Sequence, residues 1–243
     1  MKICDLHTHV LPGIDDGAQN LEQALQMLQN AVASDVAYLA VTPHFDVSMC
    51  SASQLLDRMH VQFQKLQEAA ASIPVELALG AEVRISPELM AQLELLRLPT
   101  LGGGQYLLTE FPRLMPEEQF VPVLEKLLRR DYIPLIAHPE RYYAVRRHPE
   151  MARRWQEKGY GVQVNRDSLL GLAGEYAFYC ADLLLRKGWA NCIASDAHQP
   201  QFRSPHWGEA FRQLPGIYGF HTLAYCLETI PQRILENRPL TER

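Results

Sequence analysis

The sequence predicts an α/β fold, a seven-stranded and distorted TIM-like (β/α) barrel. Short apolar runs alternate with segments whose apolar residues recur at helical spacing, which is the pattern of parallel strands joined by helices. A His, Glu, Asp or Asn follows each apolar run at its carboxyl end. These ends share one face in a closed barrel but would be spread along the edge of an open sheet, so we favour the barrel.

Seven runs are expected to form parallel strands, at residues 2–6, 36–42, 75–81, 106–109, 133–137, 161–164 and 189–194. Between the first two, Leu21, Leu25, Leu28 and Val32 recur at helical spacing. Further helices are expected at residues 55–66, at a short segment opening at 86–88, and at 120–128, 151–155, 177–184 and 223–235. The glycine run 102–104 precedes a strand and joins no strand to a helix, so it predicts a turn and not a phosphate-binding loop.

Composition restricts the class of protein. A chain of 243 residues that is 47% hydrophobic can bury a full core, and we expect one domain over residues 1–243. Five cysteines without a Cys-x-x-Cys pair indicate reduced thiols and a cytoplasmic protein. No run suits a signal peptide or a membrane span, so no membrane insertion is expected. The net charge of −5 argues against nucleic-acid binding.

Side chains suited to metal binding stand at the predicted strand ends. His7 and His9 are two apart in an extended segment, so both imidazoles point to one side. Two surface histidines are the alternative for this pair, and the spacing alone does not decide. The other strand ends carry His44, Glu82, Glu110, His138, Asn165, Asp196 and His198. For Asn165, a hydrogen bond to a ligand or to a bound water and a polar cap of its strand both remain open, and Asp15 is expected only to turn its loop.

Five of these motifs resemble the PHP (polymerase and histidinol phosphatase) superfamily. They are His7-x-His9, Pro43-His44, Gly80-Ala81-Glu82, Ala137-His138-Pro139-Glu140-Arg141 and Ser195-Asp196-Ala197-His198. Two further stretches, 11–17 (LPGIDDG) and 108–112 (LTEFP), resemble the bacterial manganese-dependent protein-tyrosine phosphatases found with capsule and exopolysaccharide genes. Other PHP branches typically have histidine where Asp16 and Glu110 stand. The resemblance covers nearly the whole chain and implies a barrel of the PHP type.

The same resemblance implies three metal ions. It assigns the first ion to His7, His9, Glu82 and Asp196, the second to Glu82 as a bridge with Glu110 and His138, and the third to Asp16, His44 and His198. Mixed imidazole and carboxylate ligands suit manganese, iron or zinc better than magnesium or calcium. Two to three divalent ions are expected, and manganese is the usual choice of the family.

Charge arithmetic agrees with a phosphatase. Four converging carboxylates would repel one another, whereas three divalent ions exceed their charge by two and leave a positive site for a phosphate monoester. Arg141 and Arg203 follow ligand loops and are the candidates to grip phosphate oxygens; surface arginines are the alternative. A metal-bound hydroxide is expected to attack phosphorus in line. By resemblance, the substrate is a phosphotyrosine segment of a bacterial tyrosine kinase that regulates capsule or exopolysaccharide synthesis.

Other functions remain open at this point. Within the superfamily, the substrate could be a small phosphate ester such as histidinol phosphate. A metal-dependent amidohydrolase barrel also begins with His-x-His, and a binding module could keep the barrel without catalysis. Cys180 and Arg186 have the Cys-x5-Arg spacing of cysteine-dependent phosphatases, but no glycine lies between them, so we interpret the match as chance. The remaining histidines, His60, His148, His206 and His221, are expected to be structural or surface residues.

Overall fold

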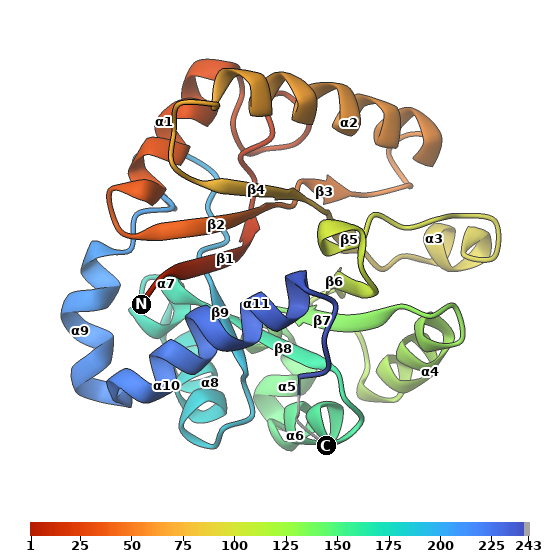
Figure 1. Ribbon diagram of the computed structural model, residues 1–243. Helices are drawn as coiled ribbons and strands as arrows, with labels where there is room; N and C mark the ends of the chain where they lie inside the picture. The colour runs from red at the N-terminus through yellow and green to blue at the C-terminus, as the bar shows by residue number, and fades with distance from the viewer. Residues whose placement is uncertain (241–243) are drawn as a thin grey trace.

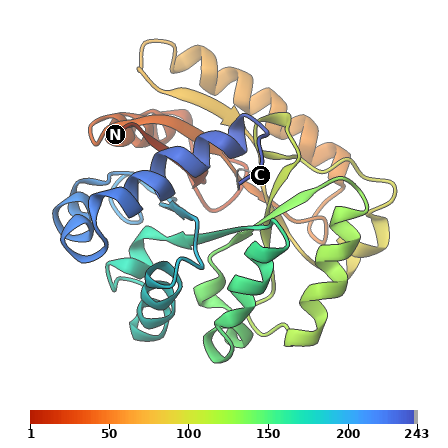
Figure 2. The same cartoon turned by 60° about the horizontal axis from the view of Figure 1, so that its bottom comes forward.

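The computed structural model describes residues 1–240, so residues 241–243 of the predicted domain lie outside the described residues. The chain alternates strands with helices, and every strand pair is parallel. The strands are β1 (Ile3–Thr8), β2 (Val36–Val41), β3 (His44–Phe45), β4 (Glu76–Leu79), β5 (Glu82–Arg84), β6 (Tyr106–Glu110), β7 (Ile133–Ala137), β8 (Gly161–Asn165) and β9 (Cys192–Ala194). The helices lie around the outside of the strands (Figures 1 and 2).

Eleven α-helices connect or follow these strands in the described chain. They are α1 (Leu21–Val32), α2 (Ala52–Ala69), α3 (Pro87–Gln92), α4 (Glu117–Leu128), α5 (Tyr143–Arg147), α6 (Glu150–Glu157), α7 (Arg166–Leu169), α8 (Glu175–Arg186), α9 (Gly208–Tyr218), α10 (Phe220–Ala224) and α11 (Ile230–Leu235). Capping residues fix where some of them begin: the side chains of Asn20 and Ser86 accept hydrogen bonds from the backbone N–H groups of Gln23 and Leu89. No helix among residues 1–240 is long and apolar enough to cross a membrane.

The predicted number of seven strands is not confirmed, because two further short strands, β3 and β5, follow the predicted runs 36–42 and 75–81. The strands form one sheet in the order β1-β2-β4 and a second in the order β3-β5-β6-β7-β8-β9. Pro43, which has no N–H group to pair, stands between β2 and β3, and Gly80 stands between β4 and β5. Backbone hydrogen bonds continue across this break, from Gly80 N to Val41 O (3.0 Å) and from Glu82 N to Pro43 O (3.0 Å).

The carboxyl end of β1 contacts the segment that follows β9. Thr8 forms an isolated parallel bridge with Ala197. Asp196 N donates to His7 O (2.9 Å) and His9 N donates to Ala197 O (2.7 Å). The buried Asp5 adds to this contact, since its Oδ1 accepts from Ser195 N (3.0 Å). The end of β1 is therefore hydrogen-bonded to the segment after β9 where His7, His9 and Asp196 stand.

Two apolar clusters hold the helices and the strands together. The larger one lies between the strands and the surrounding helices and includes Met27 and Leu28 of α1 and Leu124 of α4. The smaller one gathers residues from strands of both sheets with two residues of α11: Cys4, Leu6, Ala40, Tyr106, Leu108, Leu135, Ala137, Cys192, Ile230 and Ile234. This second cluster lies below the carboxyl ends of the strands. The polar side chains at those ends therefore rest on close-packed apolar residues.

Gly17 is expected to contribute to the stability of the fold because it packs against His9. A Cβ atom at this position would lie 2.0 Å from His9 O and 2.5 Å from His9 Cβ, so the backbone of His9 would have to move. Gly17→Ala should lower the free energy of unfolding by about 1–3 kcal/mol or more, through overpacking. Gly216→Ala is the matched control, because Gly216 lies in α9 with open space at its Cβ position. Urea unfolding of both variants should show a loss for the first alone, and equal stabilities would contradict the expected clash.

Candidate metal centre

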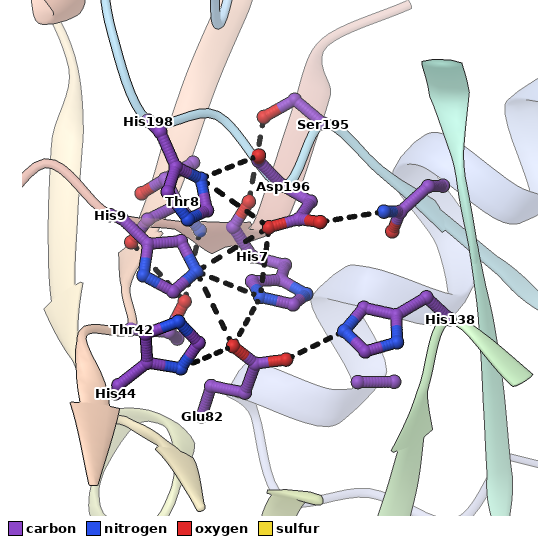
Figure 3. A network of polar contacts seen from close by, with 12 residues as sticks. His7, Thr8, His9, Thr42, His44, Glu82, His138, Ser195, Asp196 and His198 are labelled. Atoms are coloured by element: carbon purple, nitrogen blue, oxygen red, sulfur yellow. Dashed lines mark hydrogen bonds and ion pairs between the residues drawn. The ribbon is translucent and has the colours of Figure 1, made fainter. Parts of the chain in front are cut away.

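The predicted ligands lie together at the carboxyl ends of the strands. Figure 3 shows seven of them, namely His7, His9, His44, Glu82, His138, Asp196 and His198. All nine belong to groups whose ligand atoms lie within 4.8 Å of one another. The groups are His9, Asp16, His44 and His198; His7, His9 and Glu82; His7, His138 and Asp196; and His44, Glu82 and Glu110. The fold therefore brings imidazoles and carboxylates from six strand ends to one place.

His7 and His9 point to the same side of β1, as their spacing predicts. Their Nε2 atoms lie 3.1 Å apart, and both side chains are fully buried. The opposite ring nitrogens are occupied, because His7 Nδ1 lies 3.0 Å from Gln163 Oε1 and His9 Nδ1 lies 2.7 Å from Asp15 Oδ2. With neutral rings that carry their protons on Nδ1, the two Nε2 lone pairs face one another, an arrangement that a bound cation or a further proton would stabilise.

Glu82 occupies the middle of the cluster (Figure 3). Its Oε2 lies 2.9 Å from His44 Nδ1, 3.3 Å from His7 Nε2 and 3.4 Å from His9 Nε2, and its Oε1 lies 2.7 Å from His138 Nε2. A carboxylate with both oxygens directed at different imidazoles has the geometry that a bridging metal ligand requires. The side chain is 1% exposed, so water does not screen its charge.

The site has an open side formed by Asp16 and His44. Asp16 Oδ1 lies 3.5 Å from both His44 Nε2 and His198 Nε2, so these three residues form one group, as predicted from sequence. The Asp16 side chain is 69% exposed and that of His44 is 32% exposed, whereas His198 is buried. A ligand from solvent can therefore reach this group first.

Glu110 lies with His44 and Glu82. The resemblance assigns Glu110 and His138 to one ion with Glu82 as the bridge, and in the structure the ligand atoms of Glu110 are grouped with those of His44 and Glu82. His138 instead lies with His7 and Asp196, in addition to its contact with Glu82. Glu110 ends β6 next to β5, and its register opposite Arg84 sets the direction from which it approaches.

The buried charges shift one another's protonation. Burial alone would raise the pKa of Glu82, but the imidazoles of His7, His138 and His44 hold that pKa well below its usual range. The pKa of Asp196 also lies well below its usual range, because nearby imidazoles and Arg141 outweigh its burial. Burial and the neighbouring His9 lower the pKa of His198 to about 3, so its ring is neutral near pH 7. Ionised carboxylates and a neutral imidazole are the protonation states that bind metals.

Divalent ions fit this donor set. The described residues offer ring nitrogens that face one another and face carboxylate oxygens. Nitrogen and oxygen donors of this kind suit transition metals. In addition, the buried Nδ1 of His138 has no hydrogen-bond partner within the described structure, so hydrogen bonding alone does not satisfy this cluster.

Arg141 and Arg203 reach the cluster from two different loops. Arg141 Nη1 lies 3.0 Å and Arg203 Nη2 lies 2.8 Å from the same oxygen, Asp196 Oδ2. Their side chains are 21% and 40% exposed, so each guanidinium lies between a buried carboxylate and solvent. Because a guanidinium has five N–H donors, each arginine keeps donors for a further anion.

Two residues with a supporting role were not identified from the sequence. Asp15, expected only to turn its loop, accepts from His9 Nδ1 (2.7 Å), from His44 N (2.9 Å) and from Gly17 N (3.0 Å). The His9 ring holds the pKa of Asp15 at about 2 despite its burial. Gln163 contacts His7 from the middle of β8, where it reads as one more strand residue. The sequence signal that could have identified Asp15 is its place beside Asp16. A histidine that binds a metal usually donates its other ring N–H to a carboxylate, a backbone carbonyl or water.

Backbone strain is concentrated at this site. Six non-glycine residues of the described chain have positive φ, and three of them are His138 (33°), Asp196 (53°) and Arg203 (49°). Side chains with a Cβ atom adopt this region at a cost of roughly 1–3 kcal/mol each. His138 and Asp196 stand just after β7 and β9, and Arg203 stands in the loop after His198. The left-handed backbone at each position helps to set the direction of the side chain.

A cysteine nucleophile is not supported. Cys180 lies inside α8, between Ala177 and Leu184 on the buried face of that helix. Burial raises the pKa of the Cys180 thiol to about 12, so it carries no thiolate near pH 7. Arg186 binds Asp182 one turn earlier on the same helix and does not cradle an anion with Cys180. The Cys-x5-Arg spacing is therefore a chance match, as predicted.

Comparison with known proteins places this site in a family. The family model described as "Capsular polysaccharide synthesis, CpsB/CapC" matches residues 3–236. The tyrosine-protein phosphatase YwqE of Bacillus subtilis (strain 168) is 29% identical over 236 residues, 97% of this chain and 92% of YwqE. The tyrosine-protein phosphatase CpsB of Streptococcus pneumoniae is 24% identical over 95% of this chain and 97% of its own length.

Solved structures agree with these matches. A chain from the crystal structures of YwqE and CpsB, described as unique metal-dependent tyrosine phosphatases, superposes with a TM-score of 0.82 at 28% identity and covers 99% of this chain and 97% of its own length. A lactonase from Listeria monocytogenes, with a TM-score of 0.55 at 10% identity over 96% of this chain and 94% of its own, shares the fold alone. The chain therefore belongs to the CpsB/CapC family of capsular polysaccharide synthesis proteins.

Proposed function

We propose that this chain is a metal-dependent protein-tyrosine phosphatase that removes phosphate from a bacterial tyrosine kinase and so regulates capsule or exopolysaccharide synthesis. The convergence of five histidines and four carboxylates at the strand ends is the observation that carries the proposal. The relatives YwqE and CpsB, which are named tyrosine-protein phosphatases, supply the reaction. The match to the capsular polysaccharide synthesis family supports the pathway.

The nine clustered residues are the proposed metal ligands. His7, His9, Glu82 and Asp196 would hold one ion; Glu82, Glu110 and His138 a second; and Asp16, His44 and His198 a third. The contacts of Glu82 with four imidazoles support its role as the bridge. We propose manganese as the native metal, with iron or zinc as the alternatives that the same donors suit.

Arg141 and Arg203 are the proposed phosphate-binding residues. Bound divalent ions would activate water as the nucleophile and neutralise charge on the leaving oxygen. The two guanidinium groups, held on Asp196, would bind the outer phosphate oxygens and keep the phosphorus in line with the attacking oxygen. A tyrosinate with a pKa of about 10 leaves more readily than an alkoxide, so the chain needs no dedicated proton donor for it.

We further propose a single domain over residues 1–243 with the architecture of a distorted barrel. The hydrogen bonds between β1 and residues 196–197 support closure, as does the apolar cluster that draws on both sheets. We also propose a cytoplasmic location, which the five free cysteines support.

Metal removal tests the proposed function. The purified protein should contain two or three transition-metal ions per chain, measured by mass spectrometry of the metals. Chelation should abolish hydrolysis of a phosphotyrosine peptide, and manganese should restore it, because the cluster is built from ligands that need a cation. Phosphoserine peptide and histidinol phosphate serve as competing substrates in the same assay. Full activity in metal-free protein, or a preference for histidinol phosphate, would overturn the proposal.

Substitution of Cys180 separates metal chemistry from cysteine chemistry. Cys180→Ser should leave turnover nearly unchanged, since that thiol is buried in a helix. His138→Ala should abolish turnover, because it removes an imidazole from Glu82. Steady-state kinetics on a phosphotyrosine peptide measure both, with circular dichroism to verify folding. A folded but inactive Cys180→Ser enzyme would exclude the proposed mechanism.

Arg141 should contribute mainly to turnover. Arg141→Ala should lower kcat about 10²-fold, equivalent to a few kcal/mol, because it removes a charged contact to phosphate. Arg203→Ala should also lower kcat/KM, and a larger part of its effect should be an increase in KM. Arg141→Lys should rescue only partly, since a point charge does not reproduce the planar fork.

Arg147→Ala is the matched control for the Arg141 variants. Arg147 lies in α5, where its guanidinium contacts the ring and hydroxyl of Tyr143. Kinetics and metal content are measured on the same samples. An Arg141→Ala enzyme as fast as the Arg147→Ala control would show that the metals orient phosphate unaided.

A further inference from the structure

A chain of three hydrogen bonds along β8 joins His7 to Asp196. His7 Nδ1 lies 3.0 Å from Gln163 Oε1, Gln163 Nε2 donates to Asn165 Oδ1 (2.7 Å), and Asn165 Nδ2 donates to Asp196 Oδ2 (2.7 Å). All four side chains are buried, with at most 2% exposure. Two proposed metal ligands, His7 and Asp196, are thus linked through two amide side chains that are not themselves proposed ligands.

The direction of every proton in this chain follows from its acidic end. An ionised carboxylate accepts and does not donate, so Asn165 must turn its NH2 group toward Asp196 and its oxygen toward Gln163. Gln163 must then present its NH2 group to Asn165 and its oxygen to His7. An amide oxygen only accepts, so the ring proton of His7 must be on Nδ1. The lone pair of His7 is consequently on Nε2, the atom that faces His9.

The other end of the chain orients Asp196 in the same way. Asn165 Nδ2 occupies Oδ2, so the remaining oxygen, Oδ1, is the one that faces the imidazoles, 3.5 Å from His7 Nε2 and 3.4 Å from His9 Nε2. Both ends therefore direct their free lone pairs to a common point.

A buried carboxylate outside the ligand set holds this strand end in place. Glu140 Oε1 accepts from Asn165 N (2.9 Å) and from Ser168 Oγ (2.7 Å). Glu140 is fully buried, so these bonds are made away from competing water. The backbone at the end of β8 is thereby fixed, and with it the point from which the Asn165 amide reaches Asp196.

We propose that Gln163 and Asn165 are positioning residues that set the tautomer of His7 and the orientation of Asp196 for metal binding. The chain of amides adds no charge, in contrast to the carboxylate of Asp15 that performs the same task for His9. The proposal rests on the assignment of His7 and Asp196 as ligands of one ion. Neither amide contacts the substrate, so both act through the ligands alone.

Metal affinity is the first measurement. Gln163→Leu and Asn165→Leu should each weaken Mn²⁺ binding to chelator-treated protein 10–100-fold, measured by calorimetry, as is typical when a supporting partner of a metal ligand is lost. Asn191→Ala is the matched control: the Asn191 amide accepts from Val162 N in the same strand (2.8 Å) but contacts no proposed ligand. Thermal unfolding of all variants verifies that they fold.

The outcomes of this measurement separate the two levels of the argument. A parent protein that binds none of Mn²⁺, Fe²⁺ and Zn²⁺ would refute the ligand assignment and, with it, the proposed function. A parent that binds Mn²⁺, with Gln163→Leu and Asn165→Leu binding as tightly as Asn191→Ala, would overturn the role of the amides and leave the function standing. Weaker binding in the two leucine variants alone supports the proposal.

The tautomer of His7 is the second measurement, and it requires neither metal nor activity. In the metal-free parent, long-range ¹H–¹⁵N NMR of the histidine rings should show His7 protonated at Nδ1. Gln163→Leu should lose this tautomer preference, and Gln163→Glu should keep it, because a carboxylate oxygen still accepts from Nδ1. A parent with the proton on His7 Nε2, or an unchanged tautomer in Gln163→Leu, would overturn the proposal.

The two amides should also prove to be coupled. Gln163→Leu breaks the link to Asn165 as well as that to His7, so the double variant should lose less Mn²⁺ affinity than the sum of the two single losses on a free-energy scale. Additive losses would mean that the two side chains act independently and would contradict a connected chain.

Discussion

The burial of Glu82 among imidazoles is the interaction on which the structure of this site depends. One carboxylate, 1% exposed, contacts His7 and His9 at the end of β1, His44 in β3 and His138 after β7. An isolated buried carboxylate costs several kcal/mol, and its partners must compensate for that cost. The four imidazoles are therefore needed by Glu82 as much as it is needed by them. The ends of strands far apart in the sequence are held together by this shared charge.

The neighbouring apolar cluster explains why so many polar groups are tolerated here. Residues from both sheets pack with Ile230 and Ile234 of α11 below the strand ends, so the core is complete without the polar side chains. The polar side chains at the strand ends are therefore not needed to complete the core and are available for ligand binding. Their cost includes the left-handed backbone of His138, Asp196 and Arg203, which the surrounding hydrogen bonds must hold. Ions that bind the folded cluster and not the unfolded chain would stabilise the folded state and offset part of this cost.

The supporting residues divide the site by charge. His9 is backed by the carboxylate of Asp15, and His7 by the neutral amide of Gln163. Asp196 receives donors from Asn165, Arg141 and Arg203 at a single oxygen. The negative charge of Asp196 is thus balanced by two arginines, whereas the neutral amide of Asn165 contributes a hydrogen bond without charge.

The sequence by itself determined the alternation of strands and helices and which imidazole and carboxylate side chains follow the strands. Both follow from local patterns: apolar periodicity, and a polar residue after each apolar run. The sequence did not determine that two further short strands, β3 and β5, would form beyond Pro43 and Gly80 in a second sheet, because strand pairing depends on the neighbouring strand. It also did not show that Asp15 supports His9 or that Glu110 lies next to His44. The tertiary structure decided these points, since which lone pairs meet depends on register and on backbone direction, and neither quantity is local in the chain.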